Sequence, residues 1–565
     1  MAHINDTYDE RHLFDPPTSL IRGPNNTLQV IFLTLCLAGL QFTWTVEMAY
    51  GTPYLLSLGL SKSYMSLVWI AGPLSGLVMQ PVVGVISDGC RSKWGRRRPF
   101  LLGGSIVVVL SLLVIGWTRE ITWFFTRQEE GEEAFKTVSI IVAITSIYIL
   151  DFSVNCVQAS CRALIVDSLP PSRQEDGTAW AGRMVGLGNV AGYFMGYANL
   201  VKVFPFFGNT QLKVLCVFAT FVLLGCDAVT CYAVKEKVLD TNRSKSNQSP
   251  FALFSDIFRH IWHLPKPIQR ICNVQFFAWI GWFPFLFYST TWVAEIYTAS
   301  NPDTGIVHDS VGQATRAGSF AFLVYSLVSL SSSFVLPLIV MPSRRHDTEP
   351  YTIPWWGGKE LRLSCLNSIK LSFLTLPRAW TISQFVFCIC MLSTLLVTDV
   401  TAAAVVIGLC GISWAISMWA PFSLLGEYIS EQESRAFKGG QESAEFNYHV
   451  SMMASRTSLV GMVGTEPAIY HPVAIDEEEE EEIEMLEGST TTQESTDHPP
   501  AAGVLLGIHN MYIVLPQFLV TFFSSILFRI LESSEESADA IGVILRIGAV
   551  MAGIAGFISL RIGRD

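Results

Sequence analysis

Four polar residues recur at helical spacing within the apolar stretch from Val138 to Ala163: Asp151, Asn155, Gln158 and Arg162. At about 100° per residue, the last three lie within roughly 40° of Asp151, so the four form one polar stripe. A carboxylate inside an apolar helix is costly unless it meets water or a partner, and such residues mark substrate and proton pathways. The stripe predicts a transport site. The alternative is a structural brace, although about 16 Å along one helix separates Asp151 from Arg162 and prevents their direct contact.

A second acidic residue, Glu47, interrupts the apolar stretch from Leu28 to Tyr50 and has no basic residue near it in the sequence. Its carboxyl group can titrate, accept hydrogen bonds from substrate hydroxyls, or stay protonated as a structural group. The sequence alone leaves these three roles open. We take Glu47 and Asp151 as candidates for proton coupling, and Glu47 and Gln41 on the same helix as candidates for substrate binding.

Two later segments add candidate substrate-binding residues. The segment from Trp279 to Trp292 is dense in aromatic residues, including Trp282 and Tyr288, and aromatic faces suit the apolar faces of a pyranose ring. Aromatic belts at the membrane interface are the commoner use of such residues. Asn510 and Gln517 interrupt another apolar run, where a hydrogen bond between helices is the alternative to a site role.

A segment rich in glycine and arginine follows the second apolar stretch. Gly84 and Gly95 permit close packing and a tight turn, Asp88 can cap or pair at a helix end, and Arg96 and Arg97 can bridge helix C-termini. A simple basic anchor would explain the arginines but not the spacing of glycine and aspartate. The segment predicts a structural latch that gates conformational change and does not contact substrate.

The elements that must position these residues are membrane-spanning helices. Half of the 565 residues are hydrophobic and 15% are charged, a composition too apolar for a soluble domain of this size. Spanning a hydrocarbon core takes about 20 apolar residues, and in lipid such segments must be helical. We therefore predict an all-α polytopic membrane protein with twelve transmembrane helices in two six-helix bundles. The expected spans are Leu28–Tyr50, Tyr64–Ile86, Phe100–Trp117, Val138–Ala163, Ala179–Val203, Leu212–Val234, Ile271–Val293, Gln313–Met341, Ala379–Thr398, Ala402–Leu425, Ala502–Phe528 and Ile541–Leu560.

Lysine and arginine set the expected orientation, because loops rich in these residues stay in the cytosol. The clusters after the second, sixth and eighth spans place those loops and both termini on the cytosolic side. The expected division is a cytosolic tail over residues 1–27, a first bundle over 28–234, a central cytosolic loop over 235–270 and a second bundle over 271–565.

The stretch 427–500 has no spanning segment and carries the acidic run from Asp476 to Glu487. Such a composition cannot bury enough apolar surface to fold, so it predicts a disordered cytosolic loop inside the second bundle. Most of the excess negative charge lies in this run, and the net charge of −11 therefore gives no sign of a nucleic-acid partner.

Taken together, the motifs resemble those of the sucrose–proton symporters of plants and their fungal and animal relatives, in the glycoside–pentoside–hexuronide:cation branch of the major facilitator group. The resemblance covers most of the membrane region. It is carried by Thr52 to Tyr54, Ala71 to Pro73, Gln80 and Pro81, Gly95 to Pro99, Asp151 to Asp167, Gly188 and Asn189, Trp282 to Phe285, Asn510, and Pro516 and Gln517.

The resemblance implies that Asp151 carries the coupled proton and binds sugar hydroxyls, and that transport requires Arg162. The residues around Glu47 look more like fungal and animal members than plant ones. Plant members have two aspartates where this chain has Ser289 and Thr291, which leaves the plant substrate contacts of that helix in doubt here.

The expected function is proton-coupled uptake of sucrose or a related α-glucoside such as maltose, with the proton as coupling ion and a disaccharide and the lipid bilayer as partners. The alternatives are an uncoupled facilitator, a carrier of another solute, or a transport-dead nutrient sensor. The twelve cysteines lack metal-site spacing, and no nucleophile and base fall together within the spans, so we expect no cofactor, no metal and no enzyme. We expect the plasma membrane as host, with a vacuolar or other endomembrane as the alternative.

Overall fold

The computed structural model describes the chain in segments that together contain all the expected spans. The described residues are 19–88, 90–128, 131–169, 173–236, 264–300, 310–341, 352–355, 359–362, 371, 373–439, 502–532 and 539–562. Within them the chain is almost entirely helical.

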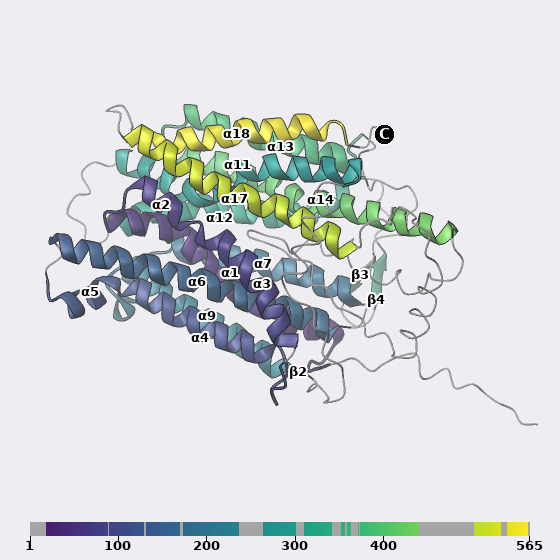
Figure 1. Ribbon diagram of the computed structural model, residues 1–565, viewed down its shortest axis with the longest axis horizontal. Helices are drawn as coiled ribbons and strands as arrows, with labels where there is room; N and C mark the ends of the chain where they lie inside the picture. The colour runs from purple at the N-terminus through teal and green to yellow at the C-terminus, as the bar shows by residue number, and fades with distance from the viewer. Residues whose placement is uncertain are drawn as a thin grey trace, which may run out of the picture.

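The first half of the chain forms one bundle, drawn in purple and blue in Figure 1. Its long helices run roughly along the same direction, and shorter helices join them at the ends. The helices are α1 (Asn26–Ser57), α2 (Lys62–Val68), α3 (Ala71–Asp88), α4 (Arg98–Gly116), α5 (Thr118–Thr126), α6 (Glu133–Ser168), α7 (Gln174–Tyr197), α8 (Leu200–Val203), the 3-10 turn η3 (Pro205–Phe207) and α9 (Gln211–Ala233).

The second half forms the bundle drawn in teal, green and yellow, which lies beside the first (Figure 1). Its elements are α11 (Lys266–Ser300), α12 (Ser310–Ile339), α13 (Leu376–Leu392), the 3-10 turn η6 (Ser393–Leu396), α14 (Val400–Gly439), α17 (Ala502–Glu532) and α18 (Ala540–Ser559).

The spans match the expected ones. Among the described residues, eleven helices are long and apolar enough to cross a membrane, with α2 and the first part of α3 counted together. The remaining expected span, Ala179–Val203, corresponds to α7 (Gln174–Tyr197), whose residues are more polar. Six spans lie in each half of the chain, which confirms the prediction of an all-α protein with two six-helix bundles.

The end of α14 and four short strands differ from the expectation. Helix α14 continues past 427 to Gly439, because the residues that follow the span are mostly good helix formers. The remaining residues of the expected loop, 440–500, lie outside the described part of the chain. The strands, which the hydropathy pattern did not indicate, form two antiparallel pairs: β1 (Ser19–Ile21) with β2 (Val234–Glu236), and β3 (Thr352–Trp355) with β4 (Lys359–Arg362).

Close helix packing inside the first bundle depends on small residues. Helix α1 packs against α7 and α9, and α4 packs against α6 and α9. A Cβ atom at Gly188 of α7 would lie 2.6 Å from the carbonyl oxygen of Ala38, and one at Gly192 would lie 2.7 Å from Thr45. These two glycines therefore let α7 approach the backbone of α1.

The two bundles touch each other mainly through α7 and α12, which run side by side, and through α2 and α17. We call the end of the molecule with the loop between α3 and α4 the loop end, and the opposite end the far end. Contacts at the far end cross between the bundles. Lys62 Nζ lies 2.7 Å from Glu295 Oε1, and Ser63 Oγ donates to the Ser525 carbonyl at 2.8 Å.

Candidate functional site

The polar stripe of α6 lies inside the protein and not toward lipid. Asp151 is 1% exposed, and its Oδ2 has no hydrogen-bond partner among the described residues. Asn155 and Gln158 are also buried, and Arg162 is partly buried further along the helix. An unpaired carboxyl oxygen in such a place is costly, because desolvation is not repaid by a hydrogen bond. The Asp151 carboxyl group is therefore available to bind a proton or a hydrogen-bond donor.

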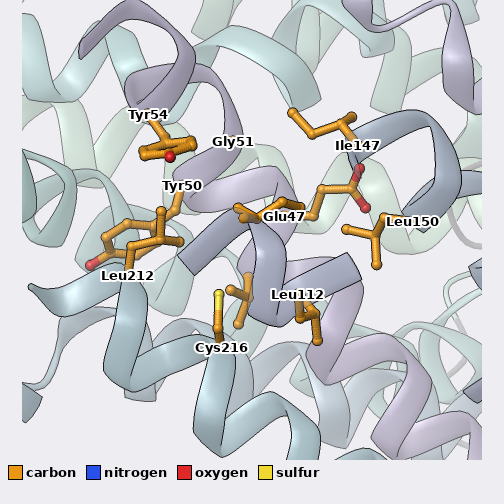
Figure 2. Close-up of a pocket in the computed structure, with 11 residues that line it drawn as sticks. Glu47, Tyr50, Gly51, Tyr54, Leu112, Ile147, Leu150, Leu212 and Cys216 are labelled. Carbon is orange, nitrogen blue, oxygen red and sulfur yellow. The ribbon is translucent and has the colours of Figure 1, made fainter. Parts of the chain in front are cut away.

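Glu47 lies next to this stripe on α1. Figure 2 shows its carboxyl group pointing between Ile147 and Leu150 of α6. Leu150 is the residue directly before Asp151. Glu47 and Asp151 lie within electrostatic range of each other. Glu47 is 5% exposed, and neither of its carboxyl oxygens has a hydrogen-bond partner among the described residues. The structure thus brings together two carboxyl groups that lie far apart in the sequence.

A small cavity borders Glu47 and separates α1 from α4, α6 and α9. It has a volume of about 20 Å³, and its walls are mostly apolar, with Tyr50 and Tyr54 on one side and Leu112 and Cys216 on another (Figure 2). A cavity of this size has room for about one water molecule. It is far too small for a sugar, so any sugar would have to approach the two carboxyl groups from another direction.

Gln41 lies nearly two turns before Glu47 on α1, and its partner is on α7. Its Nε2 donates to Asn189 Oδ1 at 2.9 Å, and Thr45 Oγ1 lies 3.0 Å from the same oxygen. Gln41 is buried. Asn189 therefore belongs to the candidate site, and the sequence placed it only within a family motif, without a role.

A hydrogen-bonded chain runs from the α6 stripe toward the second bundle. Asn155 Nδ2 donates to Ser75 Oγ at 2.9 Å, and Ser75 Oγ donates to the carbonyl of Gly72 at 2.8 Å. A Cβ atom at Gly72 would lie 3.1 Å from Nε2 of Gln517 on α17. The α6 stripe is thus connected through Ser75 to Gly72, which lies at the bundle interface close to Gln517.

The other candidate on α17, Asn510, is partly buried. Within the described chain, Asn510 Oδ1 and Gln517 Oε1 both lack a hydrogen-bond partner. Free acceptors on this helix suit hydroxyl donors of a polar solute.

Trp282 and Tyr288 of α11 lie in aromatic surroundings. The Trp282 ring centroid is 4.0 Å from that of Phe387 and 4.9 Å from that of Trp414, and its indole N–H has no partner among the described residues. Tyr288 is fully buried, and its ring centroid is 5.5 Å from that of Phe528. Both side chains are core residues of the second bundle, and no described contact joins either one to Asp151.

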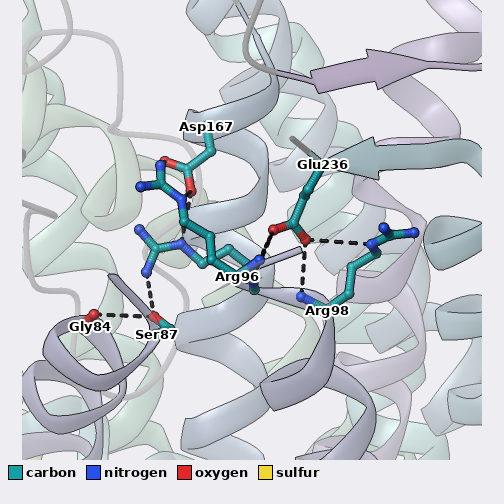
Figure 3. Close-up of polar contacts among 7 residues, drawn as sticks. Gly84, Ser87, Arg96, Arg98, Asp167 and Glu236 are labelled. Atoms are coloured by element: carbon teal, nitrogen blue, oxygen red, sulfur yellow. Dashed lines mark hydrogen bonds and ion pairs between the residues drawn. The ribbon is translucent and has the colours of Figure 1, made fainter. Parts of the chain in front are cut away.

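The glycine- and arginine-rich segment lies at the loop end, where its arginines meet Asp167 and Glu236 (Figure 3). Arg96 and Arg97 both pair with Asp167 of α6, at 2.8 Å each. Gly95 has a φ of 103°, which confirms the predicted turn. Gly84 lies within α3 and not in a turn, and a Cβ atom there would meet nothing within 4 Å, so the close packing or turn expected at this glycine is wrong; its carbonyl accepts from Ser87. Asp88 ends α3, and its side chain lies outside the described part of the structure.

One buried acidic residue was not singled out from the sequence. Asp227 of α9 is 0% exposed, and its Oδ2 lies 2.5 Å from Ser105 Oγ of α4. The rule that selected Asp151 and Glu47, an ionisable residue within an apolar span, would have selected it too. Unlike those two, Asp227 has a side-chain hydrogen bond to a neighbouring helix.

Known proteins are similar to this chain over long stretches. A family model described as MFS/sugar transport protein matches residues 34–264. The general alpha-glucoside permease of Schizosaccharomyces pombe is 32% identical over 94% of this chain and 93% of its own length. Sucrose transport protein SUT1 of Oryza sativa subsp. japonica is 33% identical over 56% of this chain and 62% of its own length.

Solved structures share the fold at low identity. A crystal structure of a D-xylose-proton symporter aligns with a TM-score of 0.50 and 12% identity, covering 95% of this chain and 98% of the other. This likeness supports the two-bundle architecture alone. The extent and identity of the fission-yeast match go further, and they show that the chain belongs to the family of MFS/sugar transport proteins, which are transporters and not enzymes.

Proposed function

We propose that this protein takes up α-glucosides, such as sucrose or maltose, together with protons, by alternating access between its two bundles. One observation carries the proposal: Glu47 and Asp151, on adjacent helices, hold buried carboxyl oxygens without hydrogen-bond partners in the described chain. The names of the permease and sucrose relatives support α-glucosides as the substrate class.

Asp151 is the proposed proton carrier. It lies midway along α6, where a rocking motion of the bundles can expose it to water on one side and then close it off. A carboxyl group that meets water on one side and sugar hydroxyls in the closed state can take up and release one proton per cycle. Glu47 is the second candidate for this role.

Several polar groups are proposed to bind sugar hydroxyls. Asn155, Gln158 and Arg162 share the α6 stripe with Asp151, and Gln517 faces the stripe from the second bundle. Amide groups both donate and accept hydrogen bonds, as a sugar hydroxyl does. Gln41 would act from α1, while Trp282, Tyr288 and Asn510 would contribute from the second bundle only after it moves.

We further propose that the loop end faces the cytosol, as its arginines indicate, and that the plasma membrane is the host. The far end would then face outward. Because the far ends of the bundles touch through Lys62 and Glu295, the described state would be closed to the outside. Residues 440–500, with the acidic run, would lie in the cytosol.

The test is uptake of radiolabelled sucrose and maltose into proteoliposomes that contain the purified protein. With an inwardly directed proton gradient, we expect sugar to accumulate inside above its equilibrium concentration. A protonophore should return the internal sugar concentration to the equilibrium level. Saturable flux that the gradient does not change would identify a facilitator. No saturable flux of either sugar, with the protein correctly inserted, would contradict the proposal and favour a carrier of another solute or a transport-dead sensor.

A further inference from the structure

Glu236, at the end of β2, holds the start of α4 through three successive backbone N–H groups. Its Oε2 accepts from Arg96 N at 2.6 Å and Arg97 N at 2.8 Å, and its Oε1 accepts from Arg98 N at 3.0 Å (Figure 3). The first N–H groups of a helix lack partners within the helix, and a carboxylate there also meets the positive end of the helix dipole. Glu236 is 8% exposed, so its contacts are shielded from water.

The turn that precedes α4 is built around this carboxylate. A Cβ atom at Gly95 would lie 2.5 Å from Glu236 Cβ, so only glycine leaves room for the side chain. Arg98 Nε lies 3.6 Å from Glu236 Oε1 and adds an ion pair. The sequence predicted the turn and the arginines but gave no sign of Glu236, because this residue lies about 140 positions away.

The strand that carries Glu236 is itself held by the N-terminal segment. In the β1–β2 pair, Ser19 lies opposite Glu236, Leu20 opposite Lys235 and Ile21 opposite Val234. Arg22 N extends the pairing by donating to the carbonyl of Ala233 at 2.8 Å. Helix α1 begins only a few residues later, at Asn26.

This pairing connects five helices at the loop end. β1 leads into α1, β2 follows α9, and Glu236 binds the start of α4. The loop that precedes α4 comes from α3, where Arg97 also contacts Ser87, and Arg96 and Arg97 reach Asp167 of α6. Helices α1 and α6 carry Glu47 and Asp151. The loop end therefore connects the two helices that carry the proton-coupling candidates.

We propose that β1 is a working part of the transport cycle, which holds Glu236 in place so that the loop end of the first bundle moves as one body. The proposal rests on the proposed function, because it assumes that the bundles rock during transport. Without β1, the three residues of β2 would be an unpaired strand, and the Glu236 side chain would lose its fixed direction. If the helices at the loop end moved independently, the change between conformations would be slower, while the affinity for sugar would stay the same.

A pair of proline substitutions separates strand pairing from other effects. In an antiparallel pair, opposite residues alternate between those that exchange backbone hydrogen bonds and those that do not. The bond from Arg22 to Ala233 places Leu20 in the bonded class and Ser19 in the other. Leu20 is 66% exposed, so Leu20→Pro removes a ladder donor at little cost in packing, and Ser19→Pro is the matched control.

Two readouts are measured for both variants. Hydrogen exchange of the amides of Arg96, Arg97 and Arg98, in detergent, should be faster in Leu20→Pro and unchanged in Ser19→Pro. Gradient-driven sugar uptake at equal surface abundance should show a maximal rate about fivefold lower in Leu20→Pro, the size of one net hydrogen bond, with an unchanged KM. The unchanged KM distinguishes a positioning role from damage to the sugar site.

A double variant tests whether β1 acts through Glu236. Glu236→Gln alone should lower the maximal rate, and adding Leu20→Pro should cause no further loss, because both changes remove the same contact. Should Leu20→Pro reduce surface abundance, Leu20→Lys and Leu20→Glu replace it. Opposite Lys235, the lysine variant should slow transport and the glutamate variant should not.

The proposal is overturned if Leu20→Pro has the same amide exchange rates and the same maximal uptake rate as Ser19→Pro. It is also overturned if the fold-reduction of the maximal rate in the double variant equals the product of the two single fold-reductions. A wild-type protein that accumulates no sugar would instead count against the proposed function. In that case the exchange rates would still decide whether β1 holds the loop.

Discussion

Three carboxyl groups are buried within the described helices of the first bundle, and their surroundings differ. Asp227 accepts a hydrogen bond from Ser105 through Oδ2 and has no described partner for Oδ1, whereas Glu47 has no described partner for either carboxyl oxygen, and Asp151 has none for Oδ2. A buried polar group with a partner is a stable structural feature, and one without a partner is costly to keep. From the side-chain hydrogen bond to Ser105 we expect a structural role for Asp227, and we propose a transport role for the other two.

Asp151→Asn should abolish proton-driven accumulation and leave uptake at the equilibrium level, because asparagine keeps the shape of the side chain but cannot ionise. The matched control is Asp227→Asn, an equally buried change of acid to amide on another helix. Asparagine can still bond Ser105, so this control should keep accumulation within about twofold of wild type. Both are measured as radiolabelled sugar accumulated in proteoliposomes at equal protein content.

If Asp151→Asn still concentrates sugar, Asp151 is a structural residue. Glu47 would then be the first candidate for the proton carrier. If Asp227→Asn abolishes accumulation while the protein remains folded, the distinction drawn from hydrogen-bond partners is wrong, and Asp227 belongs to the proton pathway.

The sequence identified the polar residues of the site but not how they meet. The free-energy cost of an ionisable residue within a membrane span identifies Glu47 and Asp151 from the sequence alone. Their proximity depends on the packing of α1 against α6, and Asn189 and Ser75 become partners of Gln41 and Asn155 only through tertiary contacts. Polar residues as small as serine and asparagine are common enough in helices that spacing alone does not mark them.

At the scale of helices, closure of the far end should depend on the ion pair between Lys62 of α2 and Glu295 of α11. The two side chains are 22% and 32% exposed, so the pair contributes no more than about 1 kcal/mol. Glu295→Gln should therefore open the far end up to about fivefold more often. A cysteine at Ser525, across the same contact, should react faster with a membrane-impermeant maleimide in a background without other reactive cysteines.

Glu120→Gln is the matched control for this measurement. Glu120 pairs with Lys213 of α9, also at the far end but within the first bundle. Losing this pair removes one charge without affecting contact between the bundles, so the labelling rate should not change. Equal acceleration by both substitutions would show that net charge, and not the contact between bundles, sets the rate.

Hydropathy predicted the helices well because lipid permits few alternatives to a helix. It did not predict β1 and β2, because three-residue strands have no periodic signal. Their pairing also joins the segment before α1 to the segment after α9, which lie far apart in the sequence. Nor did it predict that α14 continues to Gly439, because beyond the membrane the boundary depends on helix propensity and not on lipid.

For the whole molecule, we predict that deletion of the acidic run from Asp476 to Glu487 leaves transport unchanged. The run has too few apolar residues to dock on either bundle, and like charges keep it solvated. The measurement is the maximal rate and KM of sugar uptake in cells, normalised to surface abundance. A deletion of equal length across Leu505 to Pro516, inside α17, is the control that should abolish transport. Loss of flux at normal abundance would show that the run takes part in the cycle.

The pairing of Gln41 with Asn189 has a consequence for how the protein is made. The two residues are 148 positions apart, so α1 leaves the ribosome well before its partner α7 exists. At about 5–20 residues per second, this interval lasts roughly 7 to 30 s. During that time the newly made α1 carries the Gln41 amide without its native partner. The nascent chain must therefore keep its first helix beside the insertion machinery or in contact with water until α7 arrives, and this waiting period is when the protein is most exposed to quality control.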